Sequence, residues 1–314
     1  MPNERDLHSP CLVAAWPGMG AVGVSATYYL MAKLGMHQLA EFPAREFFER
    51  DSVDVKGGLV RLGRLPRSRL FLRRDPNREQ DLIVFIGEAQ PPTKGDAFCR
   101  QLIDYVQELG VERVYTFAAM ATQMRPRDES RVFGAAIDNE TLEEFNQLEF
   151  EILEEGKISG LNGILVGVAA ERGMRGGCLL GEMPHLFPQL PFPKASLAVL
   201  NGFSAMKGLD LDFSELEGEA REMEERLEDI LQRVEGSMQN PQEAADYGFS
   251  EEDDEPEEEE GKLTAAERQR LEELFQAAES DRAQAYQLKQ ELDRLKVFSD
   301  YEDRFLDLFK DPKE

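Results

Sequence analysis

Residues 12–23 read LVAAWPGMGAVG, an apolar run followed by glycines spaced Gly-x-Gly-x-x-Gly. The run from Leu12 to Trp16 has the length and composition of a buried strand, and apolar residues recur at helical spacing from Val22 to Leu34. A strand that turns through glycines into a helix opens the Rossmann nucleotide-binding unit, in which the helix N-terminus faces a pyrophosphate. The stretch therefore predicts an α/β fold and raises the question of a bound dinucleotide.

Two residues of the turn, Trp16 and Pro17, are unfavourable for binding a dinucleotide. Pro17 has no backbone N–H to offer a phosphate, and it holds Trp16 extended, with a bulky indole beside the turn. Glu41 lies near the end of the next predicted strand, Gln38 to Phe42, where a Rossmann unit holds the ribose, so both interpretations stay open here. In the alternative, the glycines let the helix pack closely on the sheet. We predict no cofactor and one possible anion site at the helix N-terminus, formed by Gly18, Met19 and Gly20.

The composition indicates a cytoplasmic protein that binds neither nucleic acid nor membranes. The chain has 62 acidic and 36 basic residues and a net charge of −26, whereas phosphate-rich partners need a basic surface. No apolar run approaches the ~20 residues that span a bilayer, and residues 1–10 do not resemble a secretory signal. The three cysteines, Cys11, Cys99 and Cys178, are widely spaced, which is typical of reduced, buried residues. No Cys/His or His/His pair has a metal-binding spacing, so no metal is predicted.

An acidic segment divides the chain. Residues 251–260 contain nine acids in ten positions, a composition that repels itself and cannot bury apolar surface. We predict an acidic, disordered linker over residues 236–262. It would separate an α/β domain of residues 1–235 from a helical extension of residues 263–314.

Strands and helices alternate before the linker, which predicts a mainly parallel sheet with helices on both faces. Two short runs around Pro66 predict an antiparallel hairpin or edge pair within residues 57–74. The other predicted elements follow in chain order. The further strands are Gly58 to Leu62, Leu70 to Leu72, Leu82 to Gly87, Arg113 to Ala118, Val132 to Ile137, Ile164 to Ala169 and Cys178 to Leu180, and the further helices are Asp96 to Leu109, Thr141 to Leu153, Lys194 to Met206 and Phe213 to Val234.

The segment after the linker predicts one long helix or two. Eight heptad positions between Leu271 and Leu295 are apolar except for Asp281, which favours a coiled coil or a helical hairpin. A denser aromatic stripe follows, and it can dock on a partner or pack against the chain's own domain or a sister chain. The predicted protein-interaction residues are Leu288, Leu292, Leu295, Phe298, Tyr301, Phe305, Leu308 and Phe309.

Few residues are candidates for catalysis. Open α/β sheets bind ligands at the carboxyl ends of their strands, where four polar residues are predicted to lie: Glu88, Thr122, Glu182 and His185. A carboxylate there is a possible general base. The alternative is that Glu88 and Glu182 cap helices or pair with arginines.

Four stretches together resemble the PAC2 family, the proteasome assembly chaperone 2 family. They are Ala15 to Gly20 with Val22-Gly23, Gly87 to Pro91, Gly156 to Gly163 and Cys178 to Pro184. The resemblance covers roughly residues 10 to 235 and is more specific than one glycine motif. It implies a three-layer α/β/α sandwich related to nucleoside phosphorylases and hydrolases. It also implies a homo-oligomer, commonly trimeric or tetrameric, in which the glycine turn is structural.

The resemblance also gives an expectation of function. Archaeal and eukaryotic members are associated with assembly of the 20S proteasome, and some proteasome-docking proteins end in a hydrophobic residue, tyrosine and any residue. This sequence instead ends Asp311-Pro312-Lys313-Glu314. We expect a non-enzymatic, oligomeric protein-interaction or assembly factor, whose C-terminal helix contacts a sister chain or another protein complex. The alternative is a small-molecule-binding protein or hydrolase-like enzyme that uses a pocket at the strand ends.

Overall fold

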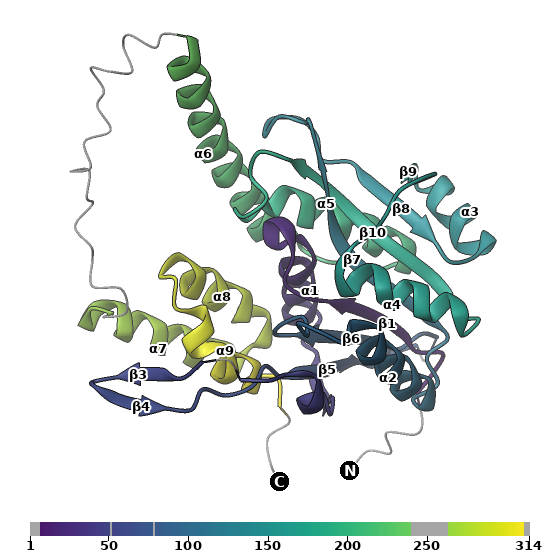
Figure 1. The fold of residues 1–314 in the computed structure, drawn as a ribbon, viewed down its shortest axis with the longest axis horizontal. Coiled ribbons are helices and arrows are strands. Elements are labelled where there is room, and N and C mark those ends of the chain that lie inside the picture. Colours follow the sequence, from purple (N-terminus) through teal and green to yellow (C-terminus); the bar gives the residue numbers. More distant parts are fainter. Residues whose placement is uncertain (1–6, 51, 78, 240–262, 311–314) are drawn as a thin grey trace.

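A mixed eight-stranded sheet forms the centre of the molecule (Figure 1). The computed structural model describes residues 7–50, 52–77, 79–239 and 263–310. The strand order is β2-β5-β6-β1-β7-β10-β8-β9, and the four central strands β6, β1, β7 and β10 are parallel. β5 and β8 are antiparallel to their inner neighbours. The predicted α/β fold with a mainly parallel sheet is confirmed.

The sheet strands are β1 (Cys11–Ala15), β2 (His37–Glu41), β5 (Ser68–Arg73), β6 (Leu82–Gly87), β7 (Arg113–Thr122), β8 (Val132–Ala136), β9 (Glu151–Ile152) and β10 (Arg175–Pro184). A separate two-stranded hairpin consists of β3 (Asp54–Lys56) and β4 (Leu59–Arg61). The helices are α1 (Val22–Lys33), α2 (Gly95–Glu108), α3 (Asn139–Gln147), α4 (Gly160–Glu171), α5 (Pro193–Lys207), α6 (Ser214–Gln239), α7 (Ala265–Ser280), α8 (Ala285–Arg294) and α9 (Phe298–Asp307).

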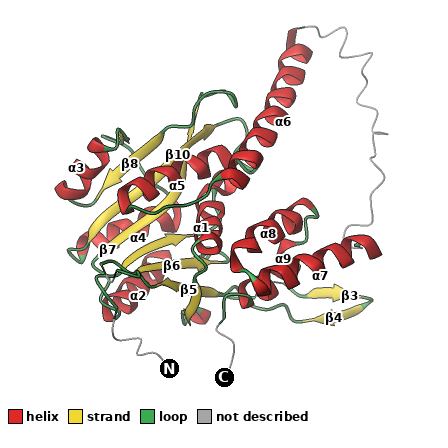
Figure 2. Ribbon diagram, turned by 180° about the vertical axis from the view of Figure 1, so that it is seen from behind, coloured by secondary structure: helices red, strands yellow, loops and turns green. Residues whose placement is uncertain are grey.

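Two hydrophobic cores lie on opposite faces of the sheet. Successive residues of a strand point to opposite faces, so Leu12 and Ala14 of β1 pack into one core and Val13 into the other. The first core contains α2 and α4, and the second contains α1, α5 and the C-terminal helices. Figure 2 shows these helical layers on either side of the sheet. None of the helices in the described part of the chain combines the length and the hydropathy that a membrane span requires.

The predicted strand Ile164 to Ala169 is wrong, because these residues lie within helix α4. α4 packs against α2 on one side and β7 on the other, so it is apolar around most of its circumference. A short apolar run of this kind fits a buried strand and a buried helix equally well.

The predicted hairpin around Pro66 is also wrong in its pairing. The run Gly58 to Leu62 pairs with Asp54–Lys56, whereas Leu70 to Leu72 belongs to β5, between β2 and β6. Gly57 and Gly58 have φ values of 61° and 76°, the left-handed conformation that a two-residue hairpin turn needs. The adjacent glycines therefore determine the turn, and Pro66 lies in the connection that follows.

The C-terminal segment forms three short helices that share the core of the α/β domain. α7 and α8 pack against each other, and α8 contacts α1. Asp281, the single polar heptad position, ends the first helix, and its side chain accepts a hydrogen bond from the Ala283 N–H. At the far end, the Gln38 N–H donates to the Phe309 carbonyl at 2.6 Å. Of the predicted linker, residues 236–239 continue α6, and the remainder, residues 240–262, lies outside the described residues.

Candidate functional site

The glycine turn after β1 is built around the buried indole of Trp16. The ring lies 5.2 Å from Phe85 and 6.1 Å from Phe98, measured between centroids. A Cβ on Gly87 would lie 2.4 Å from the indole, so this position accepts only glycine unless the ring moves. Trp16 and Gly87 come from two of the stretches that resemble the PAC2 family, and their contact joins the ends of β1 and β6.

Two backbone amides of this turn, those of Gly20 and Ala21, already have partners. Gly20 has a φ of 59°, and its N–H donates to the Pro188 carbonyl at 2.9 Å. The Ala21 N–H donates to the Gly18 carbonyl at 3.1 Å. Pro17 has no N–H, and its carbonyl accepts a 2.9 Å hydrogen bond from Gln90. This arrangement supports a packing role for the turn, and the anion site at Gly18, Met19 and Gly20 stays a prediction.

Three of the four candidate catalytic residues lie together at the ends of β7 and β10. The Thr122 hydroxyl donates to Glu182 Oε1 at 2.7 Å, and His185 Nδ1 lies 2.8 Å from the Thr122 carbonyl. Arg131 holds the Glu182 carboxylate through two bonds, from Nε at 2.7 Å and from Nη2 at 2.8 Å. This pairing with Arg131 lowers the pKa of Glu182, although burial opposes the shift. A carboxylate held as an anion in this way is a poor proton acceptor, and a catalytic role for the three residues stays a prediction.

The fourth candidate, Glu88, lies in a different charge cluster. Its carboxylate pairs with Arg64, and Arg69 Nη1 lies 3.5 Å from its Oε1. Arg69 is fully buried, and it also pairs with Asp303 of α9. Glu88 therefore takes part in the attachment of the C-terminal helices. Its contacts are those of the second alternative given for it, a carboxylate paired with arginines.

Three arginines on the segment before and within β5 bind the acidic side of α9. Asp303 accepts from Arg67 Nη1 at 2.9 Å and from Arg64 Nε at 3.0 Å, in addition to its pair with Arg69. Burial acts to raise the pKa of Asp303, but the hydrogen bond from Arg69 and the charges of the three arginines together outweigh it and lower the pKa. We define Arg64, Arg67, Arg69, Glu88 and Asp303 as the α9 ion-pair cluster. The cluster was not predicted from the sequence, because Asp303 is more than 230 residues from Arg67 and Arg69 and no local spacing connects them.

Glu302, next to this cluster, predicts a measurable effect of pH on stability. Burial and the neighbouring Glu88 raise its pKa from 4.5 to about 6. A raised folded-state pKa stabilises the native state as the pH falls through 6 toward 4.5. The wild-type free energy of unfolding should therefore rise by about 1 kcal/mol relative to Glu302→Gln between pH 7 and pH 5. Urea unfolding at both pH values measures this difference, and an unchanged or reversed difference would contradict the assignment.

The predicted protein-interaction residues of the C-terminal helices lie against the chain's own domain. Leu288, Leu292, Phe305 and Phe309 are fully buried. Phe305 lies 5.8 Å from Tyr28 of α1, and Phe309 lies 6.0 Å from Phe71 of β5, measured between ring centroids. The other four, Leu295, Phe298, Tyr301 and Leu308, are partly buried against the same core. In the described structure the aromatic stripe packs against the chain's own domain. Docking of the stripe on a partner stays a prediction.

The β3–β4 hairpin carries the most exposed large apolar side chains. Val55, Leu59 and Val60 are 67%, 64% and 69% exposed, and the flanking Val53 and Leu62 are 51% and 65% exposed. Within the described chain each strand pairs only with the other. The hairpin extends away from the main sheet (Figure 1). The sequence predicted a strand over Gly58 to Leu62 but not its exposure, because an apolar run does not reveal whether anything covers it.

The described residues contain no group of three or more His, Cys, Asp or Glu side chains that could hold a metal ion. The three cysteines are buried and unpaired, and burial raises the pKa of the Cys99 and Cys178 thiols to about 12. These thiols are therefore protonated and packed rather than reactive.

Comparison with known proteins identifies the family. The structure is similar to that of Pyrococcus furiosus PbaB, described as an archaeal proteasome activator, with a TM-score of 0.60 and 28% identity over 73% of this chain and 95% of PbaB. It is also similar to P. furiosus PbaA, described as an archaeal homolog of proteasome-assembly chaperone, with a TM-score of 0.57 and 24% identity over 74% of this chain and 96% of PbaA. Uncharacterized protein MJ1210 of Methanocaldococcus jannaschii is 26% identical over 229 residues, 71% of this chain and 84% of that protein.

The family model covers the sheet and the helices around it. It matches residues 12–231, from the second residue of β1 into α6, so that α7, α8 and α9 lie beyond the match. All four stretches that carried the resemblance fall inside these limits. Since the matched region is well over half of the sequence, the chain belongs to the PAC2 family.

Proposed function

We propose that this protein is a non-enzymatic, homo-oligomeric assembly factor that binds another protein complex. The observation that carries the proposal is the β3–β4 hairpin, whose apolar side chains on both strands are exposed. Large exposed apolar patches on soluble domains mark protein-binding surfaces, and unpaired strand edges readily accept a further strand. The hairpin offers both features.

The contacts of the candidate catalytic residues also support a non-enzymatic role. Glu182 is held by Arg131, and Glu88 is held by Arg64 and Arg69. General acid–base catalysis needs a group with a pKa close to the working pH, and the pairing with Arg131 lowers the pKa of Glu182 away from that condition. This geometry gives less support to the alternative of a hydrolase-like enzyme that uses the strand ends.

The names of the similar structures suggest the class of partner. PbaB is described as a proteasome activator and PbaA as a homolog of a proteasome-assembly chaperone. We propose that this chain likewise acts on a multisubunit protein complex. Its C-terminal helices lie against its own domain, so the proposed contact is the hairpin.

Placing a charge on the hairpin should abolish association. Val55→Asp puts a carboxylate in the middle of the exposed apolar surface, where burial against another protein would cost several kcal/mol. We expect light scattering after size exclusion to show a lower mass for Val55→Asp than for the wild type. We also expect affinity purification from the native cell to lose the co-purifying complex.

Val234→Asp is the matched control, because Val234 is another exposed valine, 46% exposed on α6. It gains the same charge and should keep the wild-type mass and the same co-purifying proteins. Thermal unfolding of both variants checks that the domain remains folded. A monomeric wild type would contradict the homo-oligomer, and a Val55→Asp variant that keeps its mass and its partner would contradict the hairpin as the contact surface.

A further inference from the structure

Basic residues concentrate in one segment of this acidic protein. Residues 45–74 contain nine basic and four acidic residues, in a chain whose net charge is −26. Part of this segment binds α9 through the α9 ion-pair cluster. Arg45, Arg50 and residues 64–67 of this segment line a hollow of about 360 Å³ between β2, the α9 ion-pair cluster and the loop before β5. Such a volume is enough for a small ligand.

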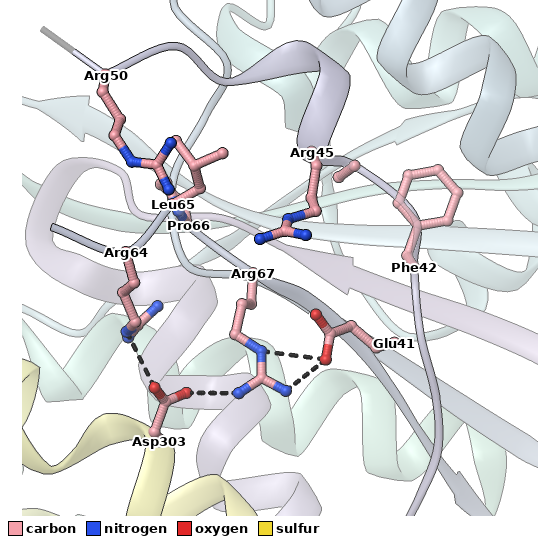
Figure 3. A pocket seen from close by; sticks show the side chains of 10 residues that line it. Glu41, Phe42, Arg45, Arg50, Arg64, Leu65, Pro66, Arg67 and Asp303 are labelled. Carbon is pink, nitrogen blue, oxygen red and sulfur yellow. Dashed lines mark hydrogen bonds and ion pairs between the residues drawn. The ribbon is translucent and has the colours of Figure 1, made fainter. Parts of the chain in front are cut away.

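Four arginines line this hollow, and two carboxylates oppose them. Arg67 is held between Glu41 and Asp303, and Asp303 also binds Arg64 (Figure 3). Glu41 and Asp303 are the only acidic residues among those that line the hollow. They are engaged with Arg64 and Arg67, so none of the described carboxylates that line the hollow pairs with the remaining two arginines.

Those two arginines are Arg45 and Arg50. In the described part of the chain, the Arg45 guanidinium has no hydrogen-bond or ion-pair partner, and its side chain extends toward Arg67 (Figure 3). Arg50 donates from Nε to the Gly63 carbonyl at 2.9 Å, which orients the guanidinium without neutralising it. Two like charges directed at the same hollow repel each other, and an anion between them would relieve that repulsion.

The backbone that carries Arg45 is firmly placed. Arg45 begins a single 3-10 turn, Arg45–Phe47, and the rings of Phe47 and Phe48 are buried against Phe98 of α2. Three apolar residues also line the hollow, namely Phe42, Leu65 and Pro66. The site therefore combines guanidinium groups with apolar surface.

We propose that this hollow binds a small phosphate monoester, whose phosphate lies between Arg45 and Arg50 and whose organic group lies against Phe42 and Leu65. A phosphate monoester carries about −1.5 to −2 charges near pH 7, which matches the two uncompensated guanidinium groups. Arginine presents paired N–H donors that fit phosphate oxygens. A polyanion such as nucleic acid would be repelled by the rest of the surface, whereas a small dianion feels mainly the charges within about 8–10 Å. Ligand binding in this hollow is independent of the protein-binding role proposed for the hairpin.

Calorimetric titration of the full chain tests the proposal. The probes are adenosine 5′-monophosphate, inorganic phosphate, succinate and adenosine. We expect saturable binding of adenosine 5′-monophosphate and weaker binding of inorganic phosphate. We expect at least a tenfold rise in the Kd of adenosine 5′-monophosphate for Arg45→Gln combined with Arg50→Gln. Arg45→Gln alone, which breaks no hydrogen bond in the described structure, should weaken binding while leaving thermal unfolding unchanged.

The control removes the same charge elsewhere. Arg61→Gln combined with Arg226→Gln replaces two exposed arginines outside the hollow and should leave the Kd within twofold of the wild type. Equal weakening in both double variants would show a general charge effect and overturn the site. The proposal is also overturned by an absence of saturable binding up to about 10 mM, or by binding of adenosine or succinate as tight as that of adenosine 5′-monophosphate.

Discussion

Replacing Gly23 by alanine is expected to lower the free energy of unfolding by about 3 kcal/mol. Gly23 lies in the first turn of α1, and a Cβ at this position would be 2.3 Å from the carbonyl oxygen of Phe117 in β7. The obstacle is backbone in the middle of the sheet, so it cannot rotate away as a side chain can. α1 would have to move outward, and the second hydrophobic core would lose contacts along its length. Chemical denaturation of wild type and variant measures the loss.

Gly167 provides the matched control, because it also lies within a helix, α4, and nothing lies within 4 Å of a Cβ built there. Gly167→Ala should raise the free energy of unfolding by about 0.5–1 kcal/mol, since alanine is the better helix former. If both glycine variants changed stability by similar amounts, the close approach of α1 to β7 would not be what requires Gly23.

Phe305→Ala should destabilise the protein by about 4 kcal/mol, which is typical of removing a fully buried aromatic ring. The ring contacts Tyr28 of α1 as well as Phe298 and Phe309, and it has no exposed surface. These contacts and the α9 ion-pair cluster hold α9 in place. When the ring is removed, α9 should detach more often and expose the apolar face of α1. Backbone amides of α9 should therefore exchange hydrogen faster in the variant, before those of the sheet do.

This variant also separates two functions of the aromatic stripe. A residue used only to bind a partner would leave the stability of the isolated chain unchanged and reduce partner capture. We expect instead that Phe305→Ala lowers the free energy of unfolding of the isolated chain. Leu186→Ala, at a position 56% exposed, is the control and should leave the free energy of unfolding within about 0.5 kcal/mol.

The sequence predicted the centre of the fold because the local pattern and the final environment agree there. The strand at Leu12, the glycine turn and the helix after it together form the strand–turn–helix pattern that is typical of a parallel sheet covered by helices. The prediction was wrong at Ile164 to Ala169 because α4 is covered on both sides, which removes the helical periodicity. At the hairpin, the turn was predicted around Pro66, whereas the two adjacent glycines, Gly57 and Gly58, form it.

The candidate site was predictable only where its residues lie at neighbouring strand ends. Thr122 and Glu182 were predicted to be close because β7 and β10 end at the same edge, and the structure places them in contact. The partners of Glu88 were not predictable in this way. Arg64 reaches Glu88 from a loop, and Arg64 in turn pairs with Asp303 on a helix near the other end of the chain, so no rule of spacing connects these residues.

The docking of α9 on α1 also has a consequence for the order of events during synthesis. Tyr28 and Glu302, which are joined by a 3.0 Å hydrogen bond, are 274 residues apart. At about 5–20 residues per second, the ribosome makes the second residue roughly 15–55 s after the first. Throughout that interval the surface of α1 that α8 and α9 will cover is uncovered on the nascent chain. The apolar surface of α1 therefore stays open to other contacts on the nascent chain until the residues of α9 have been made.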